Sequence, residues 1–156
     1  MDNEDLRDKV LNVMELGREI FVFSTVDDEG RPHARYMATL DYEDDYSAFF
    51  LGCKASSNKV QHIRRNASTQ LLFAAPDFLQ VVTISGQASA IDSMEKKREF
   101  WEKYPVLAGY FKAVDDPDFG MLRFEPEYAE LLDFNNSFDA VRAAWDSLVQ
   151  SKTPGA

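Results

Sequence analysis

The sequence FFLGCKASSNKVQHIRRN (residues 49–66) changes within a few positions from an apolar run to a small polar turn and then to a predicted helix. Ser57 and Asn58 are both good N-cap residues, and Asn58 also has capping-box spacing with Gln61, so the sequence leaves open which of them caps. Lys59 follows just inside the helix. Free backbone N–H groups, the positive end of the helix dipole and an ammonium group would then converge, which predicts a site for a phosphate-sized anion.

Arg35 is the second candidate for this anion site. It lies in PHARYMATL (residues 32–40), where strand alternation places Arg35 and Met37 on one face and Tyr36 on the other. A forked guanidinium suits the oxygens of a phosphate. The alternatives are a solvated arginine on an open sheet face and an exposed lysine in the first turn of a helix.

Composition limits the classes of partner. The chain has 156 residues, 45% of them apolar, which fits one globular domain with a substantial core. A formal net charge of −10 argues against nucleic acids and anionic membranes as partners. The acidic N-terminus, the single cysteine and the absence of an apolar run long enough for a membrane span lead us to expect a cytoplasmic protein.

Short apolar segments separated by turn residues predict a mainly β fold, a small barrel of six or seven mostly antiparallel strands with peripheral helices. The expected strands are 20–26, 31–40, 46–51, 69–75, 78–91, 119–124 and 128–134, and the expected helices are 4–16, 57–65, 94–103, 106–114 and 136–150. One domain would therefore span residues 1–156, with an N-terminal helical segment (1–17), a C-terminal helix (136–150) and a tail (151–156).

Particular residues set the expected boundaries of these elements. Asn3 and Ser93 are expected to cap helices, and Gly30 to supply a positive φ in a hairpin turn. Gly86 in the middle of a long strand predicts a bulge or a close approach of another backbone. The last helix is expected from an apolar stripe at helical spacing, formed by Phe138, Val141, Trp145 and Leu148.

Other polar or reactive residues have plainer interpretations. Cys53 is expected to be a small buried residue and not a nucleophile. His33 and His62 have no metal-ligand spacing to an acidic residue, so no metal site is expected. Gln80 is either exposed at a strand end or in contact with the polar edge of a ligand. The acidic runs at 27–29, 41–45 and 115–118 are expected to be solvated loops, and no general acid or base is evident.

Taken in order, these segments resemble the pyridoxamine 5′-phosphate oxidase-like superfamily of FMN-binding split barrels, and within it the general stress protein 26 group. The resemblance covers about residues 21–134 and rests on the order and spacing of several motifs. They are GRPHARYM (residues 30–37), SNKVQHIRRN (57–66), LQV (79–81) leading to Gly86, and DDPDF (115–119).

The resemblance implies a homodimer with two FMN sites at its interface. Arg35 and Lys59 would hold the FMN phosphate, with Ser57 and Asn58 as further donors. Three other residues would lie near the flavin ring: Met37, Cys53 and Gln80. The chemistry implied is that of an FMN-dependent oxidoreductase with hydride transfer at the flavin. A non-catalytic flavin-binding or stress-response protein, a split barrel using a deazaflavin or haem, and an interaction module without cofactor are the alternatives.

The sequence departs from the oxidases at three places. They usually carry a lysine at the position of Leu40 and an arginine at that of Asn58, so two cations are missing here. Their C-terminal Arg-x-His pattern for pyridoxal phosphate is replaced by DFNN (residues 133–136) and a predicted helix. The resemblance therefore does not imply oxidation of pyridoxamine phosphate itself, and it leaves the substrate and electron donor open.

Overall fold

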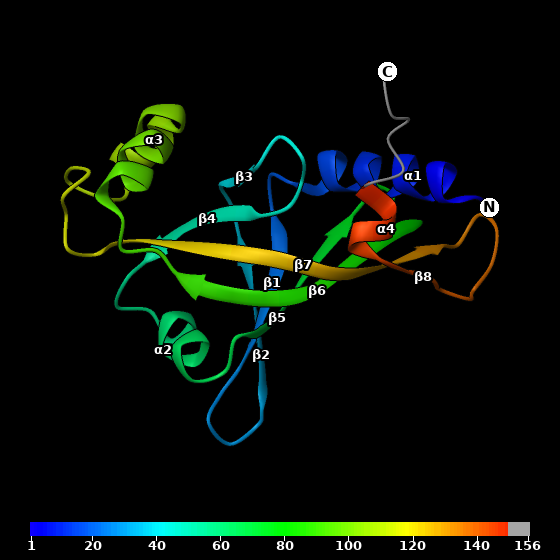
Figure 1. Ribbon diagram of the computed structural model, residues 1–156, viewed down its shortest axis with the longest axis horizontal. Helices are drawn as coiled ribbons and strands as arrows, with labels where there is room; N and C mark the ends of the chain where they lie inside the picture. The colour runs from blue at the N-terminus through cyan, green and yellow to red at the C-terminus, as the bar shows by residue number, and fades with distance from the viewer. Residues whose placement is uncertain (150–156) are drawn as a thin grey trace.

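A single curled antiparallel sheet organises the computed structural model, which describes residues 1–149 (Figure 1). The strands are β1 (Phe21–Val26), β2 (Pro32–Met37), β3 (Leu40–Tyr42), β4 (Phe49–Lys54), β5 (Ser68–Ala74), β6 (Gln80–Ala90), β7 (Phe119–Asp133) and β8 (Val141–Ala144). The helices are α1 (Asn3–Gly17), α2 (Asn58–Arg65), α3 (Met94–Lys103), the 3₁₀ helix η1 (Pro105–Gly109) and α4 (Trp145–Val149). The mainly β fold and its antiparallel pairing confirm the split-barrel expectation.

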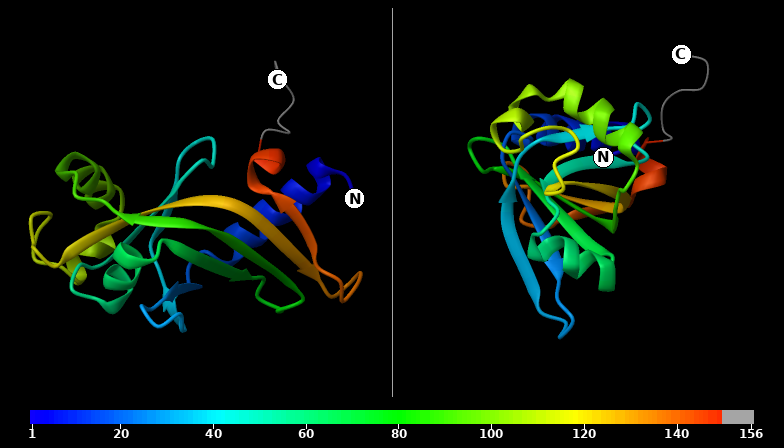
Figure 2. Two further views of the ribbon diagram at one scale, coloured as in Figure 1. Left: turned by 60° about the horizontal axis from the view of Figure 1, so that its bottom comes forward. Right: turned by 90° about the vertical axis from the view of Figure 1, so that its left-hand side faces the viewer.

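The strand order is β2-β1-β5-β6-β7-β4-β3, and β8 pairs with β7 outside this path. The long strands β6 and β7 run through the middle and arch across the molecule (Figure 2). The main core fills the curl with Phe21, Phe23, Phe49, Phe73 and Phe124, all at most 1% exposed. A smaller cluster around Phe100 and Phe119 lies beneath α3 and η1.

The pairing of β6 with β7 contains a β-bulge at Gly86, the glycine for which the sequence predicted a bulge or a close backbone approach. The register shifts between Ser85 and Gly86, so that Gly86 pairs with Pro126 and Ser85 with Tyr128. A Cβ at Gly86 would lie 2.1 Å from the carbonyl oxygen of Glu125, so only glycine fits. Proline is tolerated in a strand at a bulge. The expected break near Pro126, which divided 119–134 into two strands, is therefore wrong, and β7 continues through it.

The C-terminal helix expected over 136–150 is also wrong. Phe138 is 85% exposed, residues 141–144 form β8, and α4 has only five residues. β4 pairs with β7 from Phe119 to Phe124, and β8 pairs with the stretch of β7 from Tyr128 to Leu131. Residues 141–144 therefore form a strand because they pair with backbone groups of β7 that β4 leaves unpaired, although the apolar residues here have helical spacing. Position 150 and the expected tail at 151–156 lie outside the described residues.

Smaller boundaries differ as well. Asp2, not Asn3, caps α1 by accepting from the backbone N–H of Asp5, whereas Ser93 caps α3 as expected. The second strand ends at Met37 because Thr39 adopts a positive φ of 64°, and the chain resumes as β3 at Leu40. Gly30 has the expected positive φ, of 80°. The strand expected at 46–51 is shifted to 49–54.

We predict that Gly86→Ala destabilises the fold by about 2 kcal/mol or more, because the new methyl group would overlap the Glu125 backbone. Gly109→Ala is the matched control, since a Cβ there meets nothing within 4 Å. Urea unfolding of both variants measures the difference. Equal stability of the two variants would contradict the close approach at the bulge.

Candidate functional site

Arg35 projects from β2 toward the inner face of the sheet. It pairs with Phe23 in the register of β1 and β2, and it shares its face with the buried Met37. Its Nη1 donates to the carbonyl oxygen of Phe23 at 3.2 Å and to Oγ1 of Thr25 at 2.8 Å. These two bonds fix the guanidinium, whose partial burial lowers the pKa of Arg35 without removing its charge.

Lys59 lies in the first turn of α2 and is also partly buried. Burial is the largest cause lowering the pKa of Lys59, and the nearby positive charge of Arg35 lowers it further. The two cations predicted from the sequence are therefore close enough to repel one another. They come from two separate segments of the chain, β2 and α2.

The start of α2 leaves donors free beside these cations. Ser57 occupies the N-cap position but makes no capping bond, and its hydroxyl donates to the carbonyl of Lys54 at 2.7 Å. Asn58 is the exposed first residue of the helix and does not cap it. The expected side-chain cap is therefore absent, which leaves backbone N–H groups facing outward.

No carboxylate neutralises this cluster within residues 1–149. Neither Arg35 nor Lys59 has an ion pair with a described Asp or Glu, although the chain carries ten more acidic than basic residues. Two partly buried, mutually repelling cations beside an uncapped helix start are unfavourable unless an anion joins them. The arrangement can therefore hold a phosphate group.

Cys53 lies at the end of β4, next to this cluster. Burial, the largest cause, raises the pKa of its thiol to about 11, although the charge of Lys59 acts in the opposite direction. The interpretation of Cys53 as a buried, unreactive residue agrees with this environment.

A hollow of about 230 Å³ opens beside Cys53. Residues at the end of β2, along β4 and around η1 line it: Ala38, Thr39, Gly52, Cys53, Lys54, Leu107, Tyr110 and Phe111. Its apolar and aromatic lining suits a planar ring system.

Gln80 does not lie with the other candidates. It starts β6, where its amide donates to Asp133 at 3.3 Å, whereas α2 leads into β5 at the opposite end of β6, next to Ala88. About six residues of strand separate Gln80 from the Gly86 bulge, roughly 20 Å. Within one chain, the structure brings together Arg35, Lys59, Ser57 and Cys53.

Sequence reasoning missed the residues that support Arg35. Thr25 is fully buried, and His62 is bound to it. Asp27, expected in a solvated turn, is buried and accepts from His33 and from both the backbone and side chain of Arg31. A signal existed for Thr25: it is polar at a position that alternation from Phe21 and Phe23 assigns to the core.

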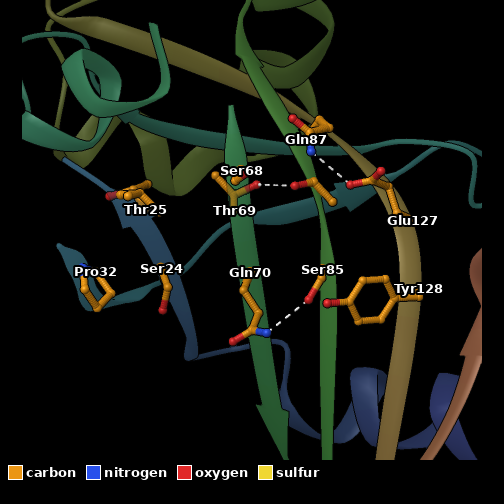
Figure 3. A pocket seen from close by; sticks show the side chains of 12 residues that line it. Ser24, Thr25, Pro32, Ser68, Thr69, Gln70, Ser85, Gln87, Glu127 and Tyr128 are labelled. Carbon is orange, nitrogen blue, oxygen red and sulfur yellow. Dashed lines mark hydrogen bonds between the residues drawn. The ribbon is translucent and has the colours of Figure 1, made fainter. Parts of the chain in front are cut away.

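A second hollow lies on the opposite face of the sheet (Figure 3). It has a volume of about 320 Å³ and is lined mainly by polar residues, among them Ser24, Gln70, Ser85 and Tyr128. Gln70 and Ser85 hydrogen-bond across β5 and β6 at 3.0 Å. No cation lines this groove, and the residue that it shares with the surroundings of Arg35 is Thr25.

Neither a metal centre nor a membrane span emerges from the described residues. No group of three His, Cys, Asp or Glu side chains within 1–149 could hold a metal ion. None of the helices in that range combines the length and apolarity needed to cross a membrane.

The sequence matches the family described as pyridoxamine 5′-phosphate oxidase over residues 7–133. The chain belongs to this family. No curated protein matches it in sequence. The family match covers most of the chain, including every element that builds the anion site.

Solved structures share the fold at low identity. A protein from Clostridium acetobutylicum related to general stress protein 26 is 18% identical, with a TM-score of 0.81 over 95% of this chain and 99% of that one. A pyridoxamine 5′-phosphate oxidase-related, FMN-binding protein from Nostoc punctiforme is 15% identical (TM-score 0.69, 92% and 98% covered). A haem-binding protein from Mycobacterium smegmatis is 14% identical (TM-score 0.71, 92% and 60% covered).

We predict that Cys53 reacts about 100-fold more slowly with iodoacetamide at pH 8 than an exposed thiol does, because a pKa of about 11 leaves little thiolate. The same protein unfolded in urea is the control, since it has the same single cysteine. Mass spectrometry over time gives both rates, and equal rates would contradict the buried, protonated thiol.

Proposed function

We propose that this protein binds FMN, with the phosphate held by Arg35, Lys59 and the start of α2. The observation that carries the proposal is that Arg35 and Lys59 are both partly buried and that neither forms an ion pair with a described carboxylate. The remaining guanidinium N–H groups of Arg35, beyond Nη1, are available for a phosphate. The FMN-binding relative from Nostoc supports this choice of ligand.

Further residues would complete the flavin site. Asn58 would supply a donor to the phosphate, and Ser57 would do so once its hydroxyl turns away from the Lys54 carbonyl. Cys53 and Met37 would lie toward the ring beside the apolar hollow. When bound, FMN supplies hydride transfer at its N5 atom, while the protein binds, orients and shields it. We therefore propose an FMN-dependent oxidoreductase of the pyridoxamine 5′-phosphate oxidase-related, general stress protein type.

Pyridoxamine phosphate itself is not the proposed substrate. Leu40 is buried at 1% exposure and Asn58 is exposed and neutral, so neither replaces the cation usual in the oxidases. The segment after β7 forms a loop and β8 and carries no Arg-x-His pattern. The grip on the cofactor phosphate is therefore weaker by two cations than in the oxidases, and the absent Arg-x-His pattern is what argues against pyridoxamine phosphate as substrate.

Haem is the alternative that one structural relative brings forward. His33 and His62 are the chain's histidines, and their rings lie 4.7 Å apart. One nitrogen of each is already bound, Nε2 of His33 to Asp27 and Nδ1 of His62 to Thr25, both at 2.8 Å. Each ring keeps one free nitrogen, so these hydrogen bonds do not decide against haem. FMN is preferred because Arg35 and Lys59 suit a phosphate group.

We further propose a homodimer in which each FMN contacts both chains. Ile20, Tyr36 and Phe78 are 66%, 77% and 73% exposed and border a hollow of about 390 Å³ over the outer face of β1 and β5. Exposed apolar residues gathered on one face are typical of an interface. Since Gln80 lies far from Lys59 within one chain, its approach to the flavin requires the partner.

We expect Arg35→Ala and Lys59→Ala each to weaken FMN binding by about 1.5–3 kcal/mol, because each removes a charge-assisted hydrogen bond to the phosphate. Arg64→Ala is the matched control, since Arg64 is exposed on the same helix. Fluorescence titration with FMN, followed by titrations with a deazaflavin and haem, gives the affinities. Unchanged FMN affinity in both site variants would refute the phosphate assignment.

We expect a dimer in sedimentation velocity at micromolar protein, and Tyr36→Asp should shift it toward monomer by placing a charge in the interface. Val106→Asp is the control, because Val106 is 54% exposed in η1 and does not line this hollow. A wild-type monomer, or equal effects of the two substitutions, would contradict the proposed interface.

A further inference from the structure

Both histidines of the chain lie beside the proposed anion site, and one of them is joined to Arg35 through a buried hydroxyl. Thr25 has no exposed surface. Its Oγ1 lies 2.8 Å from Nη1 of Arg35 and 2.8 Å from Nδ1 of His62. The hydroxyl of Thr25 is therefore the link between the guanidinium and the imidazole.

The direction of these hydrogen bonds follows from which groups can donate. A guanidinium N–H only donates, so Oγ1 of Thr25 accepts from Arg35. The Thr25 hydroxyl proton then needs an acceptor, and Nδ1 of His62 is within reach. Nδ1 accepts only when His62 is neutral with its proton on Nε2, so the bonds run from Arg35 through Thr25 to His62.

The charges around His62 come from every segment packed against it. The ring centroid of His33 lies 4.7 Å from that of His62, and His33 also binds Asp27. Asp28, in the hairpin turn, pairs with Arg65 of α2, and Lys59 lies one helical turn before His62. Partial burial is the largest cause lowering the pKa of His62. The positive charges of His33 and Arg35 act in the same direction, against Asp27 and Asp28.

We propose that His62 is a positioning residue of the anion site, acting on Arg35 through Thr25, and that its protonation is coupled to anion binding. The inference rests on the proposed phosphate site. A proton taken from solvent would turn Nδ1 of His62 into a second donor to Thr25, whose oxygen can accept two hydrogen bonds. The Thr25 hydroxyl proton then loses its acceptor in a residue with no exposed surface, a cost that the charge of a bound anion would offset. Arg35 stays held in both states.

The sign of the coupling follows from electrostatics. A bound phosphate offsets the positive charges of Arg35 and Lys59 and favours a charged imidazole nearby, so binding raises the pKa of His62. By reciprocity, protonated His62 strengthens anion binding. Affinity for the anion therefore increases as pH falls through the titration of His62.

The first measurement needs no flavin. NMR of ¹⁵N-labelled histidines resolves two side chains, and His33→Gln assigns them. We expect neutral His62 to carry its proton on Nε2, and saturating inorganic phosphate to raise its pKa. A proton on Nδ1 in the neutral state, or the same pKa with and without phosphate, would overturn the proposal.

The second measurement is FMN affinity between pH 8 and pH 6. Thr25→Val should weaken binding roughly fivefold to tenfold, and Thr25→Ser should restore it. His62→Asn should remove the part of the pH dependence that exceeds the ionisation of the phosphate itself. If Thr25→Val binds like wild type, or His62→Asn keeps the full pH dependence, His62 has no such role. Complete absence of FMN binding contradicts the proposed function instead, while the phosphate titration still decides the role of His62.

Discussion

The curl of the sheet is the constraint on which the site depends. Arg35 lies on β2, at one end of the strand order, and Lys59 follows β4, next to the other end. In a flat sheet, four strands would separate β2 from β4, yet the two side chains are electrostatic neighbours. The long pairing of β6 with β7 and its bulge at Gly86 lie between these two wings. Because bulges increase twist and bend a strand, this central ladder helps bring the cations together.

Placing Arg35 and Lys59 near one another lowers the stability of the folded protein at the proposed anion site. Elsewhere, arginines and lysines such as Arg31, Arg65 and Lys103 are paired with carboxylates. At the anion site the side chains are partly buried, burial lowers the pKa of both, and no described carboxylate intervenes. Unfavourable local arrangements, such as unpaired and partly buried charges, are expected mainly at functional sites. A bound anion would offset the positive charges here.

The sequence was most informative where a single residue determines a local conformation. Gly30, Gly86 and Ser93 could all be predicted, because each position needs a particular backbone geometry or cap. The start of α2 was also predicted, although the side-chain cap expected there does not form. Pairing between distant segments could not. β8 formed where a helical stripe was expected, and β7 continued through Pro126, because the hydrogen bonds of β7 and the bulge opposite Gly86 decided both. The cations of the site were foreseen, whereas Thr25 and His62 depend on the packing of α2 against β1.

The residues at the proposed anion site determine which of its charges are fixed and which depend on protonation. Leu40 and Asn58 contribute no charge where the oxidases carry lysine and arginine, so the fixed cations are Arg35 and Lys59. The histidines beside them are His33 and His62, whose ring centroids lie 4.7 Å apart. Since the Thr25 hydroxyl connects one of these histidines to Arg35, proton binding and anion binding act on the same hydrogen-bonded chain. In the proposed site, which lacks two cations usual in the oxidases, a protonated His62 would therefore add to the positive potential of Arg35 and Lys59.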